Sequence, residues 1–327
     1  MRYSALEKRE IIHMVDHSDL PVKLTLKELD VPRSSFYRWY HRFQEDGLEG
    51  LNNKPPHERR FWNRIPESVK DQVVELALEN PDQSSRQLAW QFTDENEYFI
   101  SESSVYRILK GFDLIVHPAF EIIPVKEKFE KPTKRVNEMW QTDFTQFKIL
   151  GWGWYYLSTV LDDYSRYILA WKLTTTMNAQ DVQDTLEIAL EKANIEKVKV
   201  RHRPRLLSDN GPCYLSKELK AYLGQKEMKH IRSAPYHPMT QGKIERYHRS
   251  MKNVVRLRNY YYPWELDQAI EAFVDFYNHQ RYHESLDNLT PADVYFGRSE
   301  EVLSKREIIK QKTLQARREF NLPMAQV

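Results

Sequence analysis

The sequence contains very little cysteine and no long apolar run, and both absences narrow its class. A single cysteine, Cys213, excludes an internal disulfide framework and any cysteine-based zinc site within one chain. No apolar stretch approaches the ~18 residues of a membrane-spanning helix, and the charged start MRYSALEKRE lacks a signal segment. The histidines also lack the HExxH spacing of zinc proteases. We therefore expect a soluble intracellular protein without a membrane partner.

The length and composition predict several folded units. With 327 residues the chain exceeds one typical domain, and its 41% hydrophobic and 13% aromatic residues are sufficient for real cores. The net charge of +2 hides a local bias, because residues 201–260 contain fourteen lysines and arginines against four acids. A basic segment that retains carboxylates is typical of a surface that holds a polyanion near a metal site. The alternative is a solvated lysine-rich surface.

Residues 1–51 are predicted to form an all-α helix-turn-helix domain. Ile11, Ile12 and Val15 give its first helix an apolar face, and residues 25–28 have the pattern of a capping box that starts a short second helix. A third helix begins near Arg33 and stops before Gly47. Such a helix can enter a major groove, although a trihelical domain can equally bind protein. The residues on its predicted DNA-facing side are Ser34, Arg38, His41 and Arg42.

A basic linker that contains proline, residues 52–66, leads to a second helical domain. Proline keeps the linker extended, so that it can follow a DNA backbone or minor groove. Its predicted DNA contacts are Arg59, Arg60 and Arg64. The second helix-turn-helix domain spans residues 67–116, with a third helix at residues 103–111. In that helix Val105, Ile108, Leu109 and Phe112 can pack inward, and the predicted DNA contacts are Ser104, Arg107 and Lys110.

After another linker, residues 117–134, the pattern changes from helix to strand. Residues 139–149, 154–161 and 166–173 are rich in β-branched and aromatic residues and predict three strands. A helix at 179–194, a strand at 205–208, a helix at 216–227 and a strand at 230–233 follow. This order predicts an α/β mixed-sheet core over residues 135–298. A basic helical tail, residues 299–327, can bind DNA or a partner subunit through Lys305, Arg306, Lys310, Lys312, Arg317 and Arg318.

Three carboxylates of this core occupy distinctive positions. Asp143 lies in the first predicted strand, and Asp209 directly follows a strand and precedes the turn Asn210-Gly211-Pro212. Ligands of α/β sheets gather outside the carboxyl ends of strands. Glu245 follows Asp209 after 35 intervening residues and lies early in a helix. We predict that these three acids form a catalytic site.

The helix that carries Glu245 also carries a basic stripe. At about 100° per residue, Arg249, Lys252 and Arg256 fall within roughly 40° of Glu245. A simple ion pair between Glu245 and Arg249 explains only one of these neighbours. The residues predicted to be buried are Ile244, Tyr247, Met251, Val254, Val255 and Leu257. The predicted DNA contacts of this region are His237, Lys243, Arg246, Arg249, Lys252 and Arg256.

Converging carboxylates require a positive partner. Left bare, they repel one another and raise one another's pKa. Mg²⁺ favours a few carboxylates together with phosphate oxygens, and two ions about 4 Å apart support in-line displacement at phosphorus. Asp162 and Asp163 are alternative ligands, but their turn setting beside Arg166 favours a structural salt bridge. Loop packing is an equally good interpretation of His237, and Trp152 and Trp154 are predicted to fix a strand entry rather than to stack on bases.

The chain also carries an ordered series of motifs. They are Trp140-Gln141-Thr142-Asp143, Leu161-Asp162-Asp163-Tyr164-Ser165-Arg166, Ser208-Asp209-Asn210-Gly211-Pro212, Pro235-Tyr236-His237-Pro238, Gly242-Lys243-Ile244-Glu245-Arg246, and Tyr277-Asn278 to His283 with Thr290-Pro291-Ala292. This series resembles the catalytic core of bacterial insertion-sequence transposases of the retroviral-integrase type, over about residues 125–300. The two upstream helical domains are similar to the end-binding region of that family.

The resemblance implies a DDE transposase with a ribonuclease-H-like core, in which Asp143, Asp209 and Glu245 bind two Mg²⁺ or Mn²⁺ ions. Such enzymes nick the ends of a mobile element and join the freed 3′-hydroxyls to target DNA. The implied partners are double-stranded DNA, namely terminal inverted repeats and target DNA, and further copies of the chain on paired ends. The implied location is the bacterial cytoplasm, at the nucleoid. The chain lacks an obvious leucine zipper between its DNA-binding and catalytic regions, which leaves the mode of multimerisation open.

Two other functions share part of this pattern. An inactive or domesticated relative that acts as a DNA-binding regulator is expected to have a broken acidic triad, whereas all three acids are present here. A nuclease without strand transfer uses the same metal chemistry. Only a joining assay on pre-nicked ends separates it from a transposase.

Overall fold

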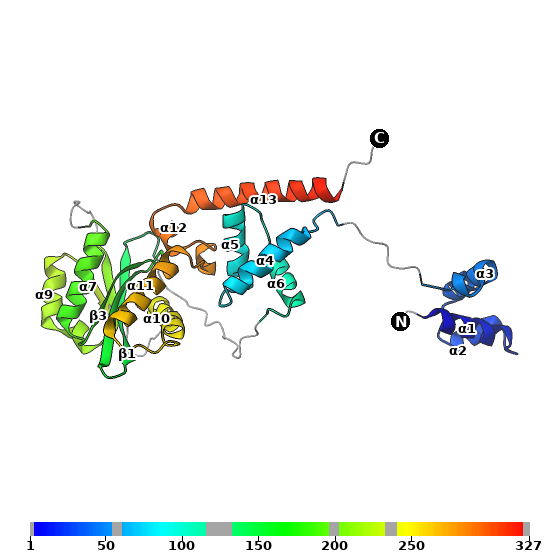
Figure 1. Cartoon of the computed structure of the whole chain (residues 1–327), viewed down its shortest axis with the longest axis horizontal. Helices are drawn as coiled ribbons and strands as arrows, with labels where there is room; N and C mark the ends of the chain where they lie inside the picture. The colour runs from blue at the N-terminus through cyan, green and yellow to red at the C-terminus, as the bar shows by residue number, and fades with distance from the viewer. Residues whose placement is uncertain (1–2, 54–60, 116–132, 196–202, 233–240, 323–327) are drawn as a thin grey trace. The chain divides into compact units, whose positions relative to one another are not determined.

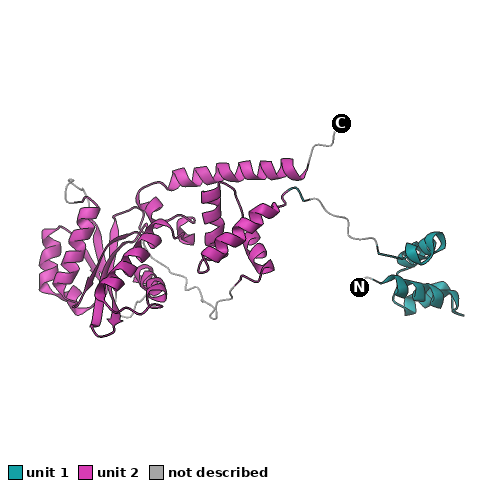
Figure 2. Cartoon of the chain, viewed as in Figure 1, with its two compact units in different colours: residues 1–62 teal, residues 63–327 magenta. Residues whose placement is uncertain are grey.

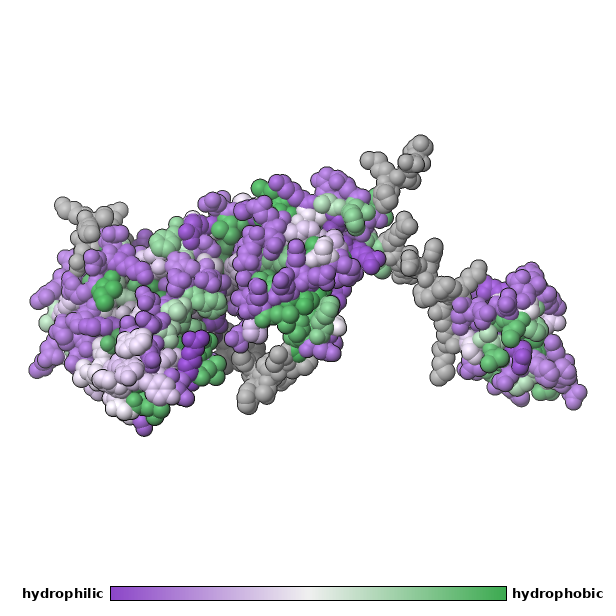
Figure 3. All heavy atoms as spheres, viewed as in Figure 1, coloured by the Kyte–Doolittle hydropathy of each residue, from purple (hydrophilic) through white to green (hydrophobic). Residues whose placement is uncertain are grey.

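The computed structural model of the chain describes residues 3–53, 61–115, 133–195, 203–232 and 241–322. The chain forms two compact units, residues 1–62 and residues 63–327 (Figure 2). None of the helices within the described ranges is long and apolar enough to cross a membrane. The visible face of each unit is mostly hydrophilic, with apolar side chains gathered in small patches (Figure 3).

The first unit is a three-helix domain. It consists of α1 (Ala5–Asp16), α2 (Val22–Glu28) and α3 (Arg33–Gly50). Its core contains Ile11, Ile12, Val15, Leu26, Val31, Phe36, Trp39 and Leu51. The helix α3 is kinked at Gly47, whose φ of +59° favours glycine, so the predicted end of the regular helix before Gly47 is confirmed. The buried ammonium of Lys8 donates to the Leu51 carbonyl oxygen at 2.8 Å and ties the first helix to the end of the third.

The capping box predicted for the second helix is wrong. The helix α2 already begins at Val22, directly after Pro21, so Thr25 lies inside it and is buried. The Thr25 hydroxyl lies 3.0 Å from the Ser18 hydroxyl and caps no helix. A capping box is found instead at α1, where Ser4 and Glu7 exchange backbone and side-chain hydrogen bonds.

The second unit begins with another three-helix domain. It contains α4 (Glu67–Glu79), α5 (Ser85–Asn96) and α6 (Glu102–Gly111). Its core contains Val69, Val73, Ala77, Leu88, Ala89, Phe92, Ile100, Val105 and Leu109. Phe112 was predicted to pack inward, but it is exposed because α6 ends at Gly111. The predicted succession of two all-α domains and an α/β core is confirmed.

The rest of the second unit is built on a five-stranded mixed sheet. Its strands are β1 (Met139–Ile149), β2 (Gly153–Asp162), β3 (Ile168–Thr174), β4 (Arg205–Ser208) and β5 (His230–Arg232), in the order β3-β2-β1-β4-β5. β1, β2 and β3 pair antiparallel, whereas β4 pairs parallel with β1 and β5 parallel with β4. β1 is therefore the central strand of the sheet.

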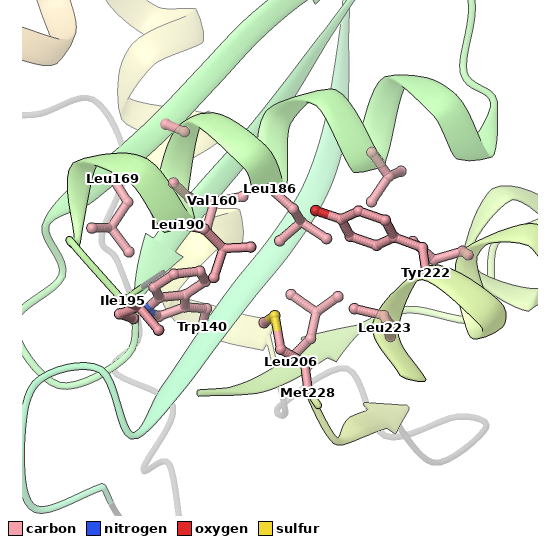
Figure 4. Close-up of a cluster of buried hydrophobic side chains, with 14 of the residues drawn as sticks. Trp140, Val160, Leu169, Leu186, Leu190, Ile195, Leu206, Tyr222, Leu223 and Met228 are labelled. Carbon is pink, nitrogen blue, oxygen red and sulfur yellow. The ribbon is translucent and has the colours of Figure 1, made fainter. Parts of the chain in front are cut away.

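Helices cover both faces of this sheet. α7 (Ala179–Lys192) and α9 (Lys217–Gln225) pack on one face, and α10 (Gly242–Val255) and α11 (Pro263–His279) on the other (Figure 1). Figure 4 shows the first of these two cores. It contains Trp140, Val160 and Leu206 of the sheet, Leu186 and Leu190 of α7, and Tyr222 and Leu223 of α9. The helix α11 is not among the predicted elements.

Short helices complete the unit. Pro212, predicted to lie in a turn, begins the one-turn helix α8 (Pro212–Leu215). After α11 come the 3-10 turn η2 (Glu284–Leu286), α12 (Pro291–Tyr295) and the long helix α13 (Ser299–Asn321). α13 runs along the second three-helix domain (Figure 1). The predicted helical character of the tail is therefore confirmed for residues 299–321.

Candidate catalytic site and nucleic-acid contacts

The strands β1 and β4 carry two of the predicted acids to the same level of the sheet. Their parallel register pairs Gln141 with Leu207. Two residues further along each strand lie Asp143 on β1 and Asp209 just beyond the end of β4. Adjacent strands are about 4.8 Å apart, so the fold brings these two carboxylates to one rim. Asp209 is exposed there, and one of its oxygens accepts the Gly211 amide at 2.8 Å.

Two side chains of α8 are influenced by both of these acids. Burial raises the pKa of the Cys213 thiol, and the negative charges of Asp209 and Asp143 raise it further. Burial likewise raises the pKa of Tyr214 well above its usual value, with added contributions from Asp143 and Asp209. The charges of both carboxylates act on Cys213 because α8 directly follows Asp209.

Glu245 faces the same space as Asp143. Both side chains line a pocket of about 420 Å³ between β1 and α10. Asp209 is not among the residues that line it. The other lining residues are Phe144, Thr145, His248, Arg249, Lys252, Asn253 and Arg256. The basic stripe predicted beside Glu245 therefore runs along this pocket.

The Asp143 carboxylate contacts two neighbouring groups, a backbone amide and a histidine ring. One carboxylate oxygen accepts the Phe144 amide at 2.8 Å, and the other lies 3.4 Å from Nδ1 of His248. The opposite ring nitrogen of His248 lies 3.2 Å from the Thr159 hydroxyl of β2. His248 is buried between these partners. The sequence analysis found only that the histidines lack a metal-ligand spacing. It could not predict the role of His248, because its partners Asp143 and Thr159 lie far away in the chain.

A buried polar network fixes the start of α10 against the sheet. The ammonium of Lys243 lies 2.9 Å from a carboxylate oxygen of Asp163 and donates to the Asp163 carbonyl oxygen at 2.7 Å. The other Asp163 oxygen accepts the Gln141 side-chain amide at 2.7 Å, and Gln141 in turn accepts the Ile244 amide at 3.1 Å. Ile244 directly precedes Glu245. Lys243 is thus engaged within the fold, and we omit it from the proposed DNA contacts.

The paired aspartates of the β2–β3 turn have structural roles. Asp163 belongs to the network just described. Asp162 accepts the amides of Asn137 and Ser165 and the Ser165 hydroxyl. Burial raises the pKa of Asp162 above its usual value, and these hydrogen bonds act in the opposite direction. The predicted structural role of both acids agrees with these contacts, although those of Asp162 are hydrogen bonds rather than a salt bridge.

Two expectations around the site are wrong. Val254 and Leu257 were predicted to be buried, but they are exposed. The buried residues of α10 are Ile244, Tyr247, His248, Met251 and Val255, and Leu257 follows the end of the helix. Trp152 and Trp154 are exposed at the β1–β2 hairpin, so packing does not fix the strand entry through them. Among the predicted basic contacts, Arg246, Arg249 and Arg256 are exposed and Lys252 is partly exposed. His237 lies outside the described residues.

The helical domains present the other predicted DNA contacts. Ser34, Arg38 and His41 are exposed on α3, and Arg42 is partly exposed. On α6, Arg107 and Lys110 are exposed and Ser104 is partly exposed. Arg64 is exposed and lies 3.8 Å from Glu67. Arg59 and Arg60 lie outside the described residues. Two of the tail cations, Arg306 and Arg317, are buried against the second three-helix domain and are not available to DNA.

The donor chemistry of the three acids suits a hard divalent cation. Carboxylate oxygens are the protein ligands that Mg²⁺ and Mn²⁺ prefer. Within the described part of the chain, however, no three His, Cys, Asp or Glu side chains are grouped closely enough to hold a metal ion. Asp143 is turned to His248 and the Phe144 amide, and Asp209 to the Gly211 amide. A three-acid site therefore requires these carboxylates to exchange their present donors for the ion.

Family comparisons agree with this fold. The integrase core domain family matches residues 133–238, and a second integrase core domain family matches residues 226–291. Homeodomain-like domains match residues 2–52 and 35–109. The chain therefore carries an integrase core domain preceded by helix-turn-helix domains of the homeodomain-like kind.

Individual relatives narrow this class. The chain is 25% identical to the transposase of transposon Tn552 from Staphylococcus aureus over 75% of this chain and 55% of that protein. It is 26% identical to the putative transposase InsK of insertion sequence element IS150 from Escherichia coli, over 49% of this chain and 54% of that protein. The chain is homologous to these transposases. It spans about half the length of each of these two relatives.

The solved structures that match the chain include retroviral integrases. The HTLV-2 integrase catalytic core domain in complex with magnesium matches 49% of this chain and 97% of its own, with 20% identity and a TM-score of 0.38. The simian T-cell lymphotropic virus intasome matches 68% of this chain and 74% of its own, with 19% identity and a TM-score of 0.44.

Proposed function

We propose that the protein is a DDE transposase that binds the ends of an insertion sequence and catalyses metal-dependent DNA cleavage and strand transfer. The observation that carries the proposal is the arrangement of the three acids. Asp143 and Asp209 lie level on neighbouring parallel strands, and Glu245 opens with Asp143 onto a pocket lined by basic side chains. The homology to the Tn552 and IS150 transposases supports it.

The proposed chemistry uses the acids as ligands and the basic stripe as a phosphate clamp. Two divalent ions, when bound by Asp143, Asp209 and Glu245, supply charge that activates an attacking oxygen and stabilises a leaving oxygen at phosphorus. Arg249, Lys252 and Arg256 hold the DNA backbone along the pocket. Water attacks first and frees a 3′-hydroxyl, which then attacks a target phosphodiester. No side-chain nucleophile takes part.

The helical domains are the proposed readers of the element ends. The exposed side chains of α3 and α6 suit insertion into successive major grooves, because the two domains belong to separate units joined by a linker. Double-stranded terminal repeats and target DNA are the proposed substrates, and copies of the chain assemble on paired ends. Since chromosomal DNA is the substrate, we expect the protein to act at the bacterial nucleoid.

The test replaces each acid by its amide. Asp143→Asn, Asp209→Asn and Glu245→Gln are each expected to abolish cleavage and joining of a labelled element end while leaving end binding in a gel-shift assay unchanged. Glu191→Gln is the matched control, because Glu191 is an exposed glutamate on α7, on the other face of the sheet from α10.

The outcomes separate the related functions. Retained cleavage by Asp209→Asn would contradict the assigned site. Pre-nicked ends with a free 3′-hydroxyl supply the second readout. If the unaltered chain cuts but never joins these ends, it is a nuclease without strand transfer. If it binds ends and performs neither reaction with Mg²⁺ or Mn²⁺, it is a DNA-binding regulator.

A further inference from the structure

Helix α13 connects the integrase core, which carries the three acids, to the second three-helix domain, which carries the proposed DNA-reading helix α6. At its beginning it continues from α12, which belongs to the integrase core. Along its length it packs on α5 of the second three-helix domain. The contacts along it are specific, and two arginines provide most of them.

Arg306 forms the first of these contacts. Its guanidinium donates to both carboxylate oxygens of Asp94 on α5, at 2.9 and 2.7 Å, and to the Asn288 carbonyl oxygen of the core at 2.9 Å. It also lies over the rings of Trp90 and Tyr282, at 4.6 and 5.3 Å. The Tyr282 hydroxyl donates to Asp94 at 2.9 Å. Only 4% of Arg306 is exposed, so one buried cation joins α13, α5 and the core segment before α12. We name this contact the Arg306 clasp.

A second contact lies three turns further along α13. Arg317, also 4% exposed, donates to the Tyr98 hydroxyl, the Asn63 side chain and the Phe99 carbonyl oxygen at 2.8, 3.0 and 2.6 Å. Between the two arginines, the Thr313 hydroxyl accepts the Phe99 amide at 3.0 Å. Residues 306, 309, 313 and 317 recur at intervals of three and four, so they form one face of the helix. This face is bound over a length of three turns.

The N-terminal end of α13 is held to the integrase core through α12, the short helix that precedes it. The Thr290 hydroxyl caps α12 by accepting the Asp293 amide at 3.2 Å. Tyr295 stacks on Tyr167 with ring centroids 4.6 Å apart, and the Tyr167 ring is buried in the core. Arg86 of α5 adds a direct ion pair to Glu284 of the core. The second three-helix domain is therefore held to the integrase core by α13 and by Arg86 and Asp94 of α5.

The clasp leaves the proposed reading helix free. Arg306 and Arg317 contact α5 and residues 98–99, which precede α6, whereas Arg107 and Lys110 of α6 are exposed. In Figure 1, α13 and α6 lie on opposite sides of this domain. DNA bound to α6 is therefore not in competition with the clasp.

We propose that α13 is a spacer that fixes the second helix-turn-helix domain relative to the catalytic pocket, so that the DNA is cut at a set distance from the sequence that α6 reads. This inference rests on the proposed function. A rigid spacer selects one phosphodiester by geometry, in the way that a positioning group selects one reacting atom. Arg306 is a positioning residue in this scheme, because it touches neither DNA nor the acids.

The first test maps the cut on end-labelled element DNA with the full chain. Arg306→Ala and Asp94→Asn are expected to bind the ends within about twofold of the unaltered chain, because α6 is unchanged. The cut is expected to spread over several neighbouring phosphodiesters, or to fall by at least tenfold at the original one. Lys305→Ala is the matched control, because Lys305 pairs with Glu97 on the surface beside the clasp, and it is expected to cut where the unaltered chain does. The same cut site and rate in Arg306→Ala, or loss of end binding, overturns the proposal.

The second test measures the distance between the second three-helix domain and the integrase core, and it needs no DNA cleavage. Spin labels are placed on Ser103→Cys in α6 and Glu191→Cys in α7 in a Cys213→Ser background, all within the full chain. We expect a narrow distance distribution that becomes broad when Arg306→Ala is added, and circular dichroism checks that both domains remain folded. An equally narrow distribution after this substitution overturns the spacer. A chain that shows the change in distances but never cuts DNA contradicts the proposed function and leaves the spacer intact.

Discussion

His283 makes the stability of the core depend on pH. Burial, and after it the charges of Arg281, Arg166 and Arg246, together lower the pKa of His283 to about 3. Its Nε2 atom is buried and has no hydrogen-bond partner among the described residues, so a proton there would add an unpaired buried charge. An unfolded histidine has a pKa of about 6.5. Between pH 6.5 and pH 3 His283 is therefore protonated in the unfolded chain and neutral in the folded one. Stability is therefore complete above pH 6.5 and declines as the pH falls towards 3.

We predict that His283→Gln reduces this acid sensitivity. Between pH 7 and pH 5 the unaltered chain should lose about 2 kcal/mol of unfolding free energy more than the variant, from 1.36 kcal/mol per pH unit. Urea unfolding at both pH values measures the difference. His279→Gln is the control, because His279 is exposed on the same stretch of chain. Equal losses in His283→Gln and the unaltered chain would show that another group controls the acid limb.

The sequence predicts some of these residues well and others poorly, for a physical reason. Asp143 and Asp209 could be placed from the sequence because each lies in or directly after a predicted strand. Their common level is visible only in the sheet, where β4 pairs with β1 although β2, β3 and α7 lie between them in the chain. Lys243 was assigned to DNA because its partner Asp163 lies 80 residues away. The partners of His248, Arg306 and Arg317 are equally distant in the chain. A side chain's charge is local information, whereas its partner is fixed only by the tertiary fold.

The bounds of helices and strands were predictable where the residue pattern pointed to one kind of element without a competing signal. The strand predicted at residues 139–149 from its β-branched and aromatic residues has these same bounds in the structure. The start of α2 was misplaced because Pro21 precedes it without a capping side chain, and Pro at the start of a helix is a second, competing signal. The helix α10 was predicted to bury Val254 and Leu257, yet its packing ends at Val255. Packing partners, and not the wheel alone, decide which part of a helix face is covered.

The helix α10 should lose its alignment when its anchor is removed. Asp163→Ala deletes the acceptor of Lys243 and Gln141 and leaves a partly buried ammonium without its carboxylate. Breaking such a pair costs about 3 kcal/mol, and we predict a loss of that order in chemical unfolding. Gln141 also accepts the amide of Ile244, which directly precedes Glu245. Loss of this alignment should therefore reduce cleavage by more than tenfold, with end binding unchanged. Asp184→Ala removes a half-exposed ion pair with Lys172 and serves as control. A loss below 1 kcal/mol in Asp163→Ala would contradict the anchoring role.

The helix α6 is predicted to act through phosphate or base contacts that depend on salt. Lys110→Ala should weaken end binding severalfold at about 0.1 M salt and reduce the slope of log affinity against log salt by about 1, since one counterion release is lost. Titrations at several salt concentrations measure the slope. Lys220→Ala is the control, because Lys220 is an exposed lysine on α9 of the integrase core and belongs to neither helical domain. An unchanged slope for Lys110→Ala removes α6 from the DNA interface.

At the scale of the whole molecule, the two units are expected to unfold separately. The first unit has its own core and the second carries both the integrase core and the other helical domain. Phe36→Ala and Phe92→Ala each empty a fully buried aromatic site, which costs about 3–5 kcal/mol. In calorimetry we predict that Phe36→Ala lowers only the transition of the first unit. Phe92→Ala should lower the transition that contains the integrase core, because Arg306 and Arg317 couple the two parts. A third, separate transition in Phe92→Ala would show that α13 does not make them one cooperative body.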